Sequence, residues 1–217
     1  MKEEILEKIR NCIVNIDIKS IRSLVKEALA AGIPAYEVLM KGMAEGMDVV
    51  GQKYEAKEYF LSELLGAGEI MKEGIAELTP HLQVEKIKHV GKVVIGTVRG
   101  DIHDIGKNIV VMLLTSAGFE VYDLGVDVPP ERFAEKVKET DADIVAMSAM
   151  LTMTMGEMKT VIEELKKASS REKVKVIIGG APITNEYAQE IGADAAGMDA
   201  AHGVRICKQW MSGGLLQ

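Results

Sequence analysis

The spacing of the apolar residues changes once along the chain, near residue 89, and this change constrains the fold more than any other feature. Before it, apolar residues recur three or four positions apart, as Ile5 and Ile9 do. After it, short β-branched runs alternate with stretches of helical spacing. The first pattern is typical of amphipathic helices and the second of buried strands alternating with helices. We therefore expect a helical domain at residues 1–89 and an α/β domain at residues 90–217.

Turn-forming residues divide the first domain into four or five predicted helices, which we expect to pack as a small bundle. The breaks are expected at Asn15–Asp17, Gly32–Pro34 and Tyr54–Glu58, with Thr79 and Pro80 closing the last helix. The stretch from there to His89 is polar and carries several charges. It is therefore predicted to be a linker.

The second domain alternates five predicted strands with helices. The strands are expected at Lys92–Val98, Glu120–Leu124, Asp143–Ser148, Lys175–Ile178 and Ala193–Gly197. The helices are expected at Asn108–Ser116, Pro130–Glu139, Gly156–Ser169, Asn185–Ile191 and Ala201–Met211. This alternation predicts a doubly wound, five-stranded parallel sheet of the Rossmann or flavodoxin-like type, with helices on both faces. In such sheets the ligand binds at the carboxyl ends of the strands.

The charge balance narrows the range of partners. The 217 residues carry a formal net charge of -7, and 47% of them are hydrophobic. An acidic chain offers no cationic surface to nucleic acid or to an anionic membrane. We therefore expect proteins and small molecules as partners.

Cysteine use and the start of the chain indicate where the protein works. The two cysteines, Cys12 and Cys207, are far apart and match no metal-binding or redox spacing, which is typical of reduced thiols in the cytosol. The first residues lack the apolar segment of a signal peptide, and no apolar run is long enough to span a membrane. The sequence predicts a cytoplasmic protein.

The loop after the first predicted strand carries the pattern Asp101-x-His103-x-x-Gly106. A phosphate-binding P-loop is a poor match, because five residues separate Gly100 from Gly106 and Asn108 stands where a hydroxyl is needed. A metal-dependent phosphohydrolase would need further ligands, and the three other histidines lie in no such pattern.

Two interpretations of this loop remain open. In an extended loop, residues two apart point to the same side, so Asp101 can accept a hydrogen bond from one ring nitrogen of His103 and leave the other for a metal. One imidazole cannot hold a free ion tightly, so a macrocycle would have to supply the other ligands. Alternatively, the loop is only a polar turn in which Asp101 or Asp104 caps a helix.

The spacing of further motifs favours the first interpretation. Ser148-x-Met150 and Gly179-Gly180 follow the loop motif at the ends of later strands. Together, the three motifs resemble the cobalamin-binding signature shared by methionine synthase, corrinoid-dependent mutases and methyltransferase corrinoid proteins. Methionine stands at position 150 where the family usually has leucine, a change that a pocket wall tolerates.

The resemblance implies a cobalamin-type corrinoid that is bound base-off, with His103 as the lower ligand of cobalt. The detached nucleotide tail would enter a slot lined by Gly96, Ser148, Gly179 and Gly180. Thr154 would join the pair formed by Asp101 and His103. The remaining predicted cofactor contacts are Ile102, Gly106, Met150 and Thr152.

The first domain resembles the helical cap of methionine synthase and of methanogen methylamine and methanol corrinoid proteins. The matching stretches are Lys41–Gly51 and Glu58–Leu61. The resemblance implies that the cap covers the upper, methyl-bearing face of the corrinoid. The candidate covering residues are Phe60, Leu61, Leu64 and Leu65.

A chain with this resemblance and no further domain is expected to be a methyl carrier in methanogenesis and not an enzyme on its own. The implied partners are a methylamine:corrinoid methyltransferase, a corrinoid:coenzyme M methyltransferase and a reductive activase. Monomethylamine is the first expectation for the methyl donor, with dimethylamine, trimethylamine or methanol as alternatives. Two rival classes are a B12-binding sensor, which would need a basic DNA-binding segment, and a flavodoxin-like nucleotide-binding module without cobalt.

Overall fold

The computed structural model describes residues 2–82 and 89–213. The chain divides into two compact units, Met1–His89 with Ser116–Gly118, and Val90–Thr115 with Phe119–Gln217. Most of the predicted linker falls at residues 83–88, outside the described residues. In the described ranges, no helix combines the length and the apolar character needed to cross a membrane.

The first unit is helical, as predicted. Its elements are α1 (Lys2–Val14), α2 (Ile21–Ala30), α3 (Ala35–Glu37), a π-helix (Val38–Ala44), α4 (Glu45–Glu55) and α5 (Leu61–Leu82). The predicted breaks fall between these helices. The prediction that Thr79 and Pro80 close the last helix is wrong, because α5 continues to Leu82 with Pro80 in its last turn. A proline lacks its own amide donor, but the residues after it can remain helical for part of a turn.

Two glycines let α1 pack closely on its neighbours. A Cβ atom on Gly42 would lie 3.0 Å from Cγ2 of Ile9, and one on Gly46 would lie 3.0 Å from the carbonyl oxygen of Arg10. Gly42 lies in the π-helix and Gly46 in α4, four positions later. The glycines therefore have a structural role in the core of this unit.

The second unit is a parallel sheet in the order β2-β1-β3-β4-β5. The strands are β1 (Lys92–Thr97), β2 (Glu120–Asp123), β3 (Ile144–Ser148), β4 (Lys175–Gly179) and β5 (Ala195–Gly197). Its helices are α6 (Ile105–Ser116), α7 (Pro130–Thr140), α8 (Gly156–Lys167), a 3₁₀ turn (Arg171–Lys173), α9 (Asn185–Ile191) and α10 (Ala200–Met211). This strand order is flavodoxin-like, and its switch point lies between β1 and β3. The predicted doubly wound fold is confirmed.

The start of α6 differs from its prediction. The helix was expected from Asn108, but the amide of Asn108 already donates to the carbonyl of Asp104, 2.7 Å away, and the helix begins at Ile105. Its first turn therefore contains Gly106. Glycine is a poor helix former, so sequence propensity places this turn in the loop.

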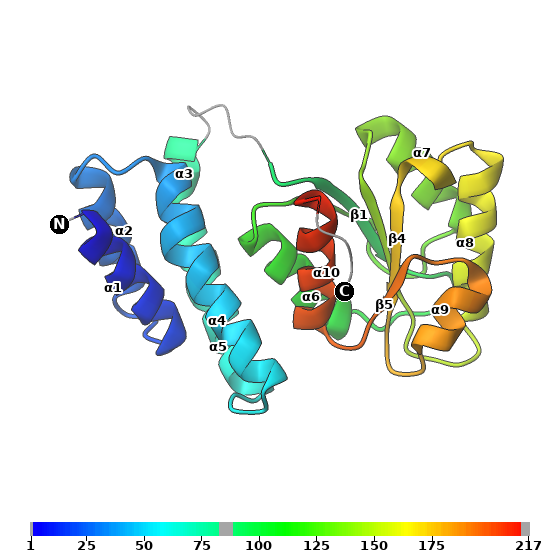
Figure 1. Cartoon of the computed structure of the whole chain (residues 1–217), viewed down its shortest axis with the longest axis horizontal. Coiled ribbons are helices and arrows are strands. Elements are labelled where there is room, and N and C mark those ends of the chain that lie inside the picture. Colours follow the sequence, from blue (N-terminus) through cyan, green and yellow to red (C-terminus); the bar gives the residue numbers. More distant parts are fainter. Residues whose placement is uncertain (1, 83–88, 214–217) are drawn as a thin grey trace. The chain divides into compact units, whose positions relative to one another are not determined.

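Helices α6 and α10 cover one face of the sheet, and α7, α8 and α9 cover the other (Figure 1). On the second face the core is dense, with Phe133, Val145 and Ile178 fully or almost fully buried. On the first face, by contrast, a cavity remains between the helices and the strands.

Candidate functional site

The chain turns sharply after β1, and this turn places Asp101. The amide of Asp101 donates to the carbonyl of Val98 at 3.1 Å, and Gly100 takes a φ of +79°, which favours glycine. The carboxylate of Asp127 accepts from the amide of Gly100 at 2.7 Å. The amide of Asp127 in turn donates to the carbonyl of Asp101 at 2.9 Å. The loop after β2 therefore fixes the loop after β1.

The carboxylate of Asp101 is the centre of a buried hydrogen-bond network. Its Oδ1 accepts from the amide of His103 at 3.0 Å and lies 2.8 Å from the ring Nδ1 of His103. Its Oδ2 accepts from the amide of Met150 at 2.8 Å and lies 2.7 Å from the hydroxyl of Thr154. The structure therefore brings together the three residues that the resemblance connects: Asp101, His103 and Thr154. Met150 joins them through its backbone amide.

The charge of Asp101 decides which nitrogen of His103 carries the proton. Burial alone would raise the pKa of Asp101, but the hydrogen bonds from His103, Met150 and Thr154 together hold it well below its usual value. An ionised carboxylate only accepts hydrogen bonds, so Nδ1 of His103 must be the donor. In the neutral ring, Nε2 then keeps its lone pair. The side chain of His103 is 51% exposed, so this nitrogen can reach a ligand.

Large apolar side chains are exposed around His103. Ile102 is 74% exposed, Met150 is 49% exposed and Met153 is 91% exposed. Thr152, in the same loop as the two methionines, is also exposed. Exposed apolar residues that cluster on one edge of a protein are typical of a binding surface. Here they lie in the loop that carries His103 and in the loop that binds Asp101 through Met150 and Thr154.

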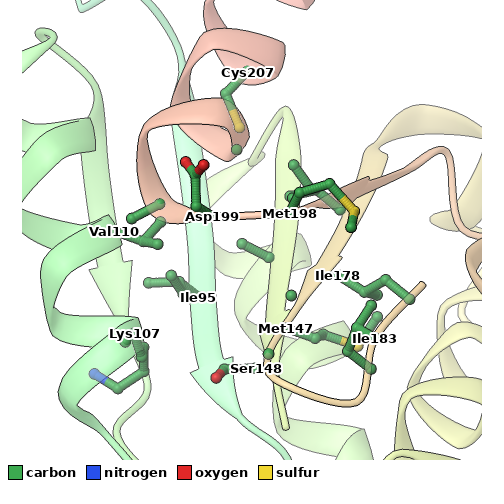
Figure 2. Close-up of a pocket in the computed structure, with 18 of the residues that line it drawn as sticks. Ile95, Lys107, Val110, Met147, Ser148, Ile178, Ile183, Met198, Asp199 and Cys207 are labelled. Carbon is green, nitrogen blue, oxygen red and sulfur yellow. The ribbon is translucent and has the colours of Figure 1, made fainter. Parts of the chain in front are cut away.

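A cavity of about 310 Å³ lies between the sheet and helices α6 and α10 (Figure 2). Ser148, Gly179, Gly180 and Gly106 line it, as do apolar residues of the three central strands. The register places Ser148 beside Thr97 of β1 and Gly179 of β4, at the carboxyl edge of the sheet. A cavity therefore lies at the edge of the sheet where the slot was predicted.

The predicted role of Gly96 in lining this slot is wrong. Successive residues of a strand point to opposite faces, and Ile95 is the residue of β1 that lines the cavity. A Cβ atom on Gly96 would lie 2.9 Å from the ring of Phe133, on the opposite face of the sheet. Gly96 therefore makes room for a core phenylalanine and not for a ligand.

Gly180 allows two loops to touch. Its φ is +132°, and a Cβ atom there would lie 1.8 Å from the carbonyl oxygen of Ala149. Ala149 comes directly after β3, and its amide donates to the carbonyl of Gly179 at 3.1 Å. The loop after β4 can therefore run against the loop after β3 only because position 180 has no side chain.

Several residues of the cavity were not among the predicted site residues. The additional lining residues come from α6 (Val110 and Leu114), from α10 (Gly203 and Cys207) and from the residue just before α10 (Asp199). One signal was available in the sequence. Gly203 and Cys207 are four positions apart and therefore share a helix face, and a small pair on the last helix of an α/β domain leaves space over the sheet.

The four predicted cap residues do not form one surface. Phe60 is 70% exposed, and Leu61 and Leu65 are 44% and 43% exposed. Leu64 is only 1% exposed and belongs to the buried stripe of α5 with Met71. Its prediction as a covering residue is therefore wrong, because its helical phase directs it into the core.

Comparison with known proteins agrees with this geometry. Residues 91–204 match a family model described as a B12 binding domain, and residues 5–79 match a second model with the same description. The chain is 45% identical to the trimethylamine corrinoid protein of Methanosarcina barkeri, over 95% of this chain and 96% of that protein. It is 41% identical to dimethylamine corrinoid protein 2 of Methanosarcina acetivorans, over 98% of each.

Solved structures show the same likeness. A cobalamin-binding protein from Desulfitobacterium hafniense matches with a TM-score of 0.80 and 37% identity, over 94% of this chain and 98% of that one. A methanol:cobalamin methyltransferase complex from M. barkeri matches with a TM-score of 0.86 and 28% identity, over 98% of this chain and 81% of that one. The M. barkeri monomethylamine corrinoid protein matches with a TM-score of 0.54 and 37% identity, over 97% of this chain and 100% of that one.

Proposed function

The chain belongs to the family of B12-binding proteins, and from this we propose that it is a corrinoid protein that carries a methyl group on cobalt between two methyltransferases. One observation supports this most strongly. The buried carboxylate of Asp101 orients His103 so that Nε2 is free to bind a metal, beside a cavity at the carboxyl edge of the sheet.

The residues present fit a corrinoid. His103 offers a single nitrogen, which suits a metal whose other ligands come from a macrocycle. In the described part of the chain, no group of three or more His, Cys, Asp or Glu side chains could hold a bare ion. A Cβ atom on Gly106 would touch nothing within 4 Å, so space that the protein does not use adjoins the cavity. When bound, the corrinoid would supply the cobalt atom that accepts and releases the methyl group.

The chain's own residues would bind and orient this cofactor. We propose that it binds base-off, with His103 as the lower ligand and the nucleotide tail in the cavity beside Ser148 and Gly179. Asp101, held by Thr154, would fix the imidazole and its tautomer. The remaining predicted contacts would lie against the corrin ring: Ile102, Gly106, Met150 and Thr152.

The methyl donor is proposed to be trimethylamine or dimethylamine. Relatives named for these amines are 45% and 41% identical to the chain. The relatives therefore favour the alternatives to the first expectation, which was monomethylamine. The partners would be the matching methylamine:corrinoid methyltransferase, a corrinoid:coenzyme M methyltransferase and a reductive activase. Support for a methyltransferase partner comes from the similarity to a component of a methyltransferase complex.

The helical unit is proposed to cover the upper face of the corrinoid. Three of its exposed apolar residues, Phe60, Leu61 and Leu65, lie at the start of α5, whereas an ordinary surface helix would present polar side chains there. Covering would keep water from the methyl-bearing face, and uncovering would admit a partner enzyme.

Reconstitution with purified components tests the carrier function. The full chain loaded with corrinoid, supplied with trimethylamine and coenzyme M, should stay inert. Turnover should begin only when both a trimethylamine methyltransferase and a coenzyme M methyltransferase are present. Parallel assays with dimethylamine, monomethylamine and methanol, each with its own methyltransferase, should identify the donor. Multiple turnovers by the chain alone would rule out the carrier function.

The same assay tests the cap. Phe60→Ala should slow transfer several-fold, because it removes the most exposed aromatic side chain of the proposed covering surface. Phe60→Leu is the matched control, since it keeps an apolar side chain at the same exposed position. Equal transfer rates for the two variants would mean that Phe60 does not cover the cofactor.

A further inference from the structure

Two charged side chains line the cavity between the sheet and helices α6 and α10, and one of them is in an ion pair within the protein. Lys107 is buried, and its ammonium group donates to Asp123 at 2.6 Å and to Asn108 at 2.7 Å. The other charged lining residue is Asp199. Asp199 is half-buried, and most of the remaining lining is apolar.

Asp199 uses only one of its oxygens within the protein. It is the N-cap of α10, and its Oδ1 accepts from the amide of His202 at 2.8 Å. In the described part of the chain, Oδ2 accepts no hydrogen bond. An N-cap needs a single acceptor, which serine or asparagine supplies equally well. The second oxygen is therefore not required for the fold.

Close packing brings this carboxylate to the cavity. A Cβ atom on Gly197 would lie 3.2 Å from Cα of Gly203, whereas one on Gly203 would make only ordinary contacts at 3.8 Å, so the close approach of β5 and α10 depends on Gly197. The short connection between them holds Asp199 against the cavity. In Figure 2, Asp199 and Cys207 appear at one part of the cavity, and Ser148 and Lys107 appear at another.

We infer that Oδ2 of Asp199 accepts a hydrogen bond from a hydroxyl of the corrinoid's nucleotide tail, an inference that rests on the proposed function. A tail that fills the cavity displaces water from the carboxylate, which then needs a donor from the ligand. Ribose hydroxyls are such donors, and acidic residues at strand ends bind them in dinucleotide-binding folds. A hydroxyl on the lower base is the other source with the same chemistry. Asp199 thus favours binding of corrinoids that carry a nucleotide tail over those that lack one.

Substitutions at position 199 separate this role from capping. Asp199→Asn keeps an oxygen for His202 and places an amide donor where Oδ2 stood. Asp199→Ser keeps the cap and removes the second group. Affinities are measured for three corrinoids: one with a dimethylbenzimidazole base, one with a hydroxybenzimidazole base, and cobinamide, which has no tail. Thr184→Asn is the control, because Thr184 caps α9 through the amide of Tyr187 and does not line the cavity.

Both variants at position 199 should lose about tenfold in affinity for tailed corrinoids and bind cobinamide as the unsubstituted protein does. Equal losses with both bases would assign the ribose hydroxyl, and a loss only with hydroxybenzimidazole would assign the base. The inference is overturned if tailed corrinoids bind unchanged, or if cobinamide weakens as much as they do. An unsubstituted protein that binds no corrinoid would instead refute the proposed function.

Discussion

Replacing Gly180 by alanine should lower the free energy of unfolding by about 3 kcal/mol or more, because the new side chain has no place to go. The glycine has a φ of +132°, a backbone conformation that other residues rarely adopt. The added Cβ would also lie 1.8 Å from the carbonyl oxygen of Ala149. The loops after β3 and β4 would have to separate, and the carboxyl edge of the sheet would lose its shape.

Gly106→Ala is the matched control, since Gly106 also lines the cavity. Its Cβ would meet nothing, and it lies in the first turn of α6, where alanine should stabilise the protein by up to about 1 kcal/mol. Chemical denaturation followed by fluorescence measures both variants. The only tryptophan, Trp210, lies in α10 and reports on the α/β unit. Equal stabilities for the two variants would contradict the tight contact at Gly180.

Removing the carboxylate of Asp101 should have an effect of similar or greater size. Asp101→Ala leaves the part-buried amides of His103 and Met150 without this acceptor, and the hydroxyl of Thr154 keeps only its hydrogen bond to the carbonyl of Leu151. Each donor left without an acceptor costs about 1–3 kcal/mol, so the combined loss should be about 3 kcal/mol. The same denaturation experiment should show a loss of this size. Corrinoid affinity should also fall, because the imidazole of His103 would no longer be oriented.

Asp104→Ala is the control for this prediction. Asp104 lies in the same loop but is exposed, and its carboxylate accepts a single side-chain hydrogen bond from Asn108 at 3.0 Å. Its removal should change stability by less than about 1 kcal/mol. If the two aspartate variants were equally stable, the network around Asp101 would not hold the loop together.

The sequence predicts much of the fold and of the loop around His103, because both depend on the spacing of residues that are close together in the chain. Five apolar runs at regular spacing require a parallel sheet with helices on both faces. A separation of two positions in an extended loop is enough to place Asp101 beside the ring of His103. These contacts involve residues close together in the chain, so local geometry determines them.

Some features that depend on the direction in which a residue points, or on distant elements, were not predicted correctly. The alternation of faces along β1 decides which side of the sheet Gly96 faces. Glycine has no side chain whose polarity would indicate that side in the sequence. Leu64 is apolar like its neighbours, and only its packing in the helical unit distinguishes it from Leu65. Asp199 meets the cavity because α10 lies on the same face as α6, and no spacing around Asp199 in the sequence encodes that meeting.

Electron paramagnetic resonance of the full chain loaded with a corrinoid and reduced to cobalt(II) tests the central claim most directly. If His103 is the lower ligand, the nitrogen hyperfine splitting should change when the protein is made with ¹⁵N-labelled histidine. The labelled His103→Ala variant should lose this coupling. The protein should remain folded, because the ring is half exposed and its removal leaves no buried gap. A splitting that ignores the label, or that persists in His103→Ala, would show that His103 does not bind the cobalt.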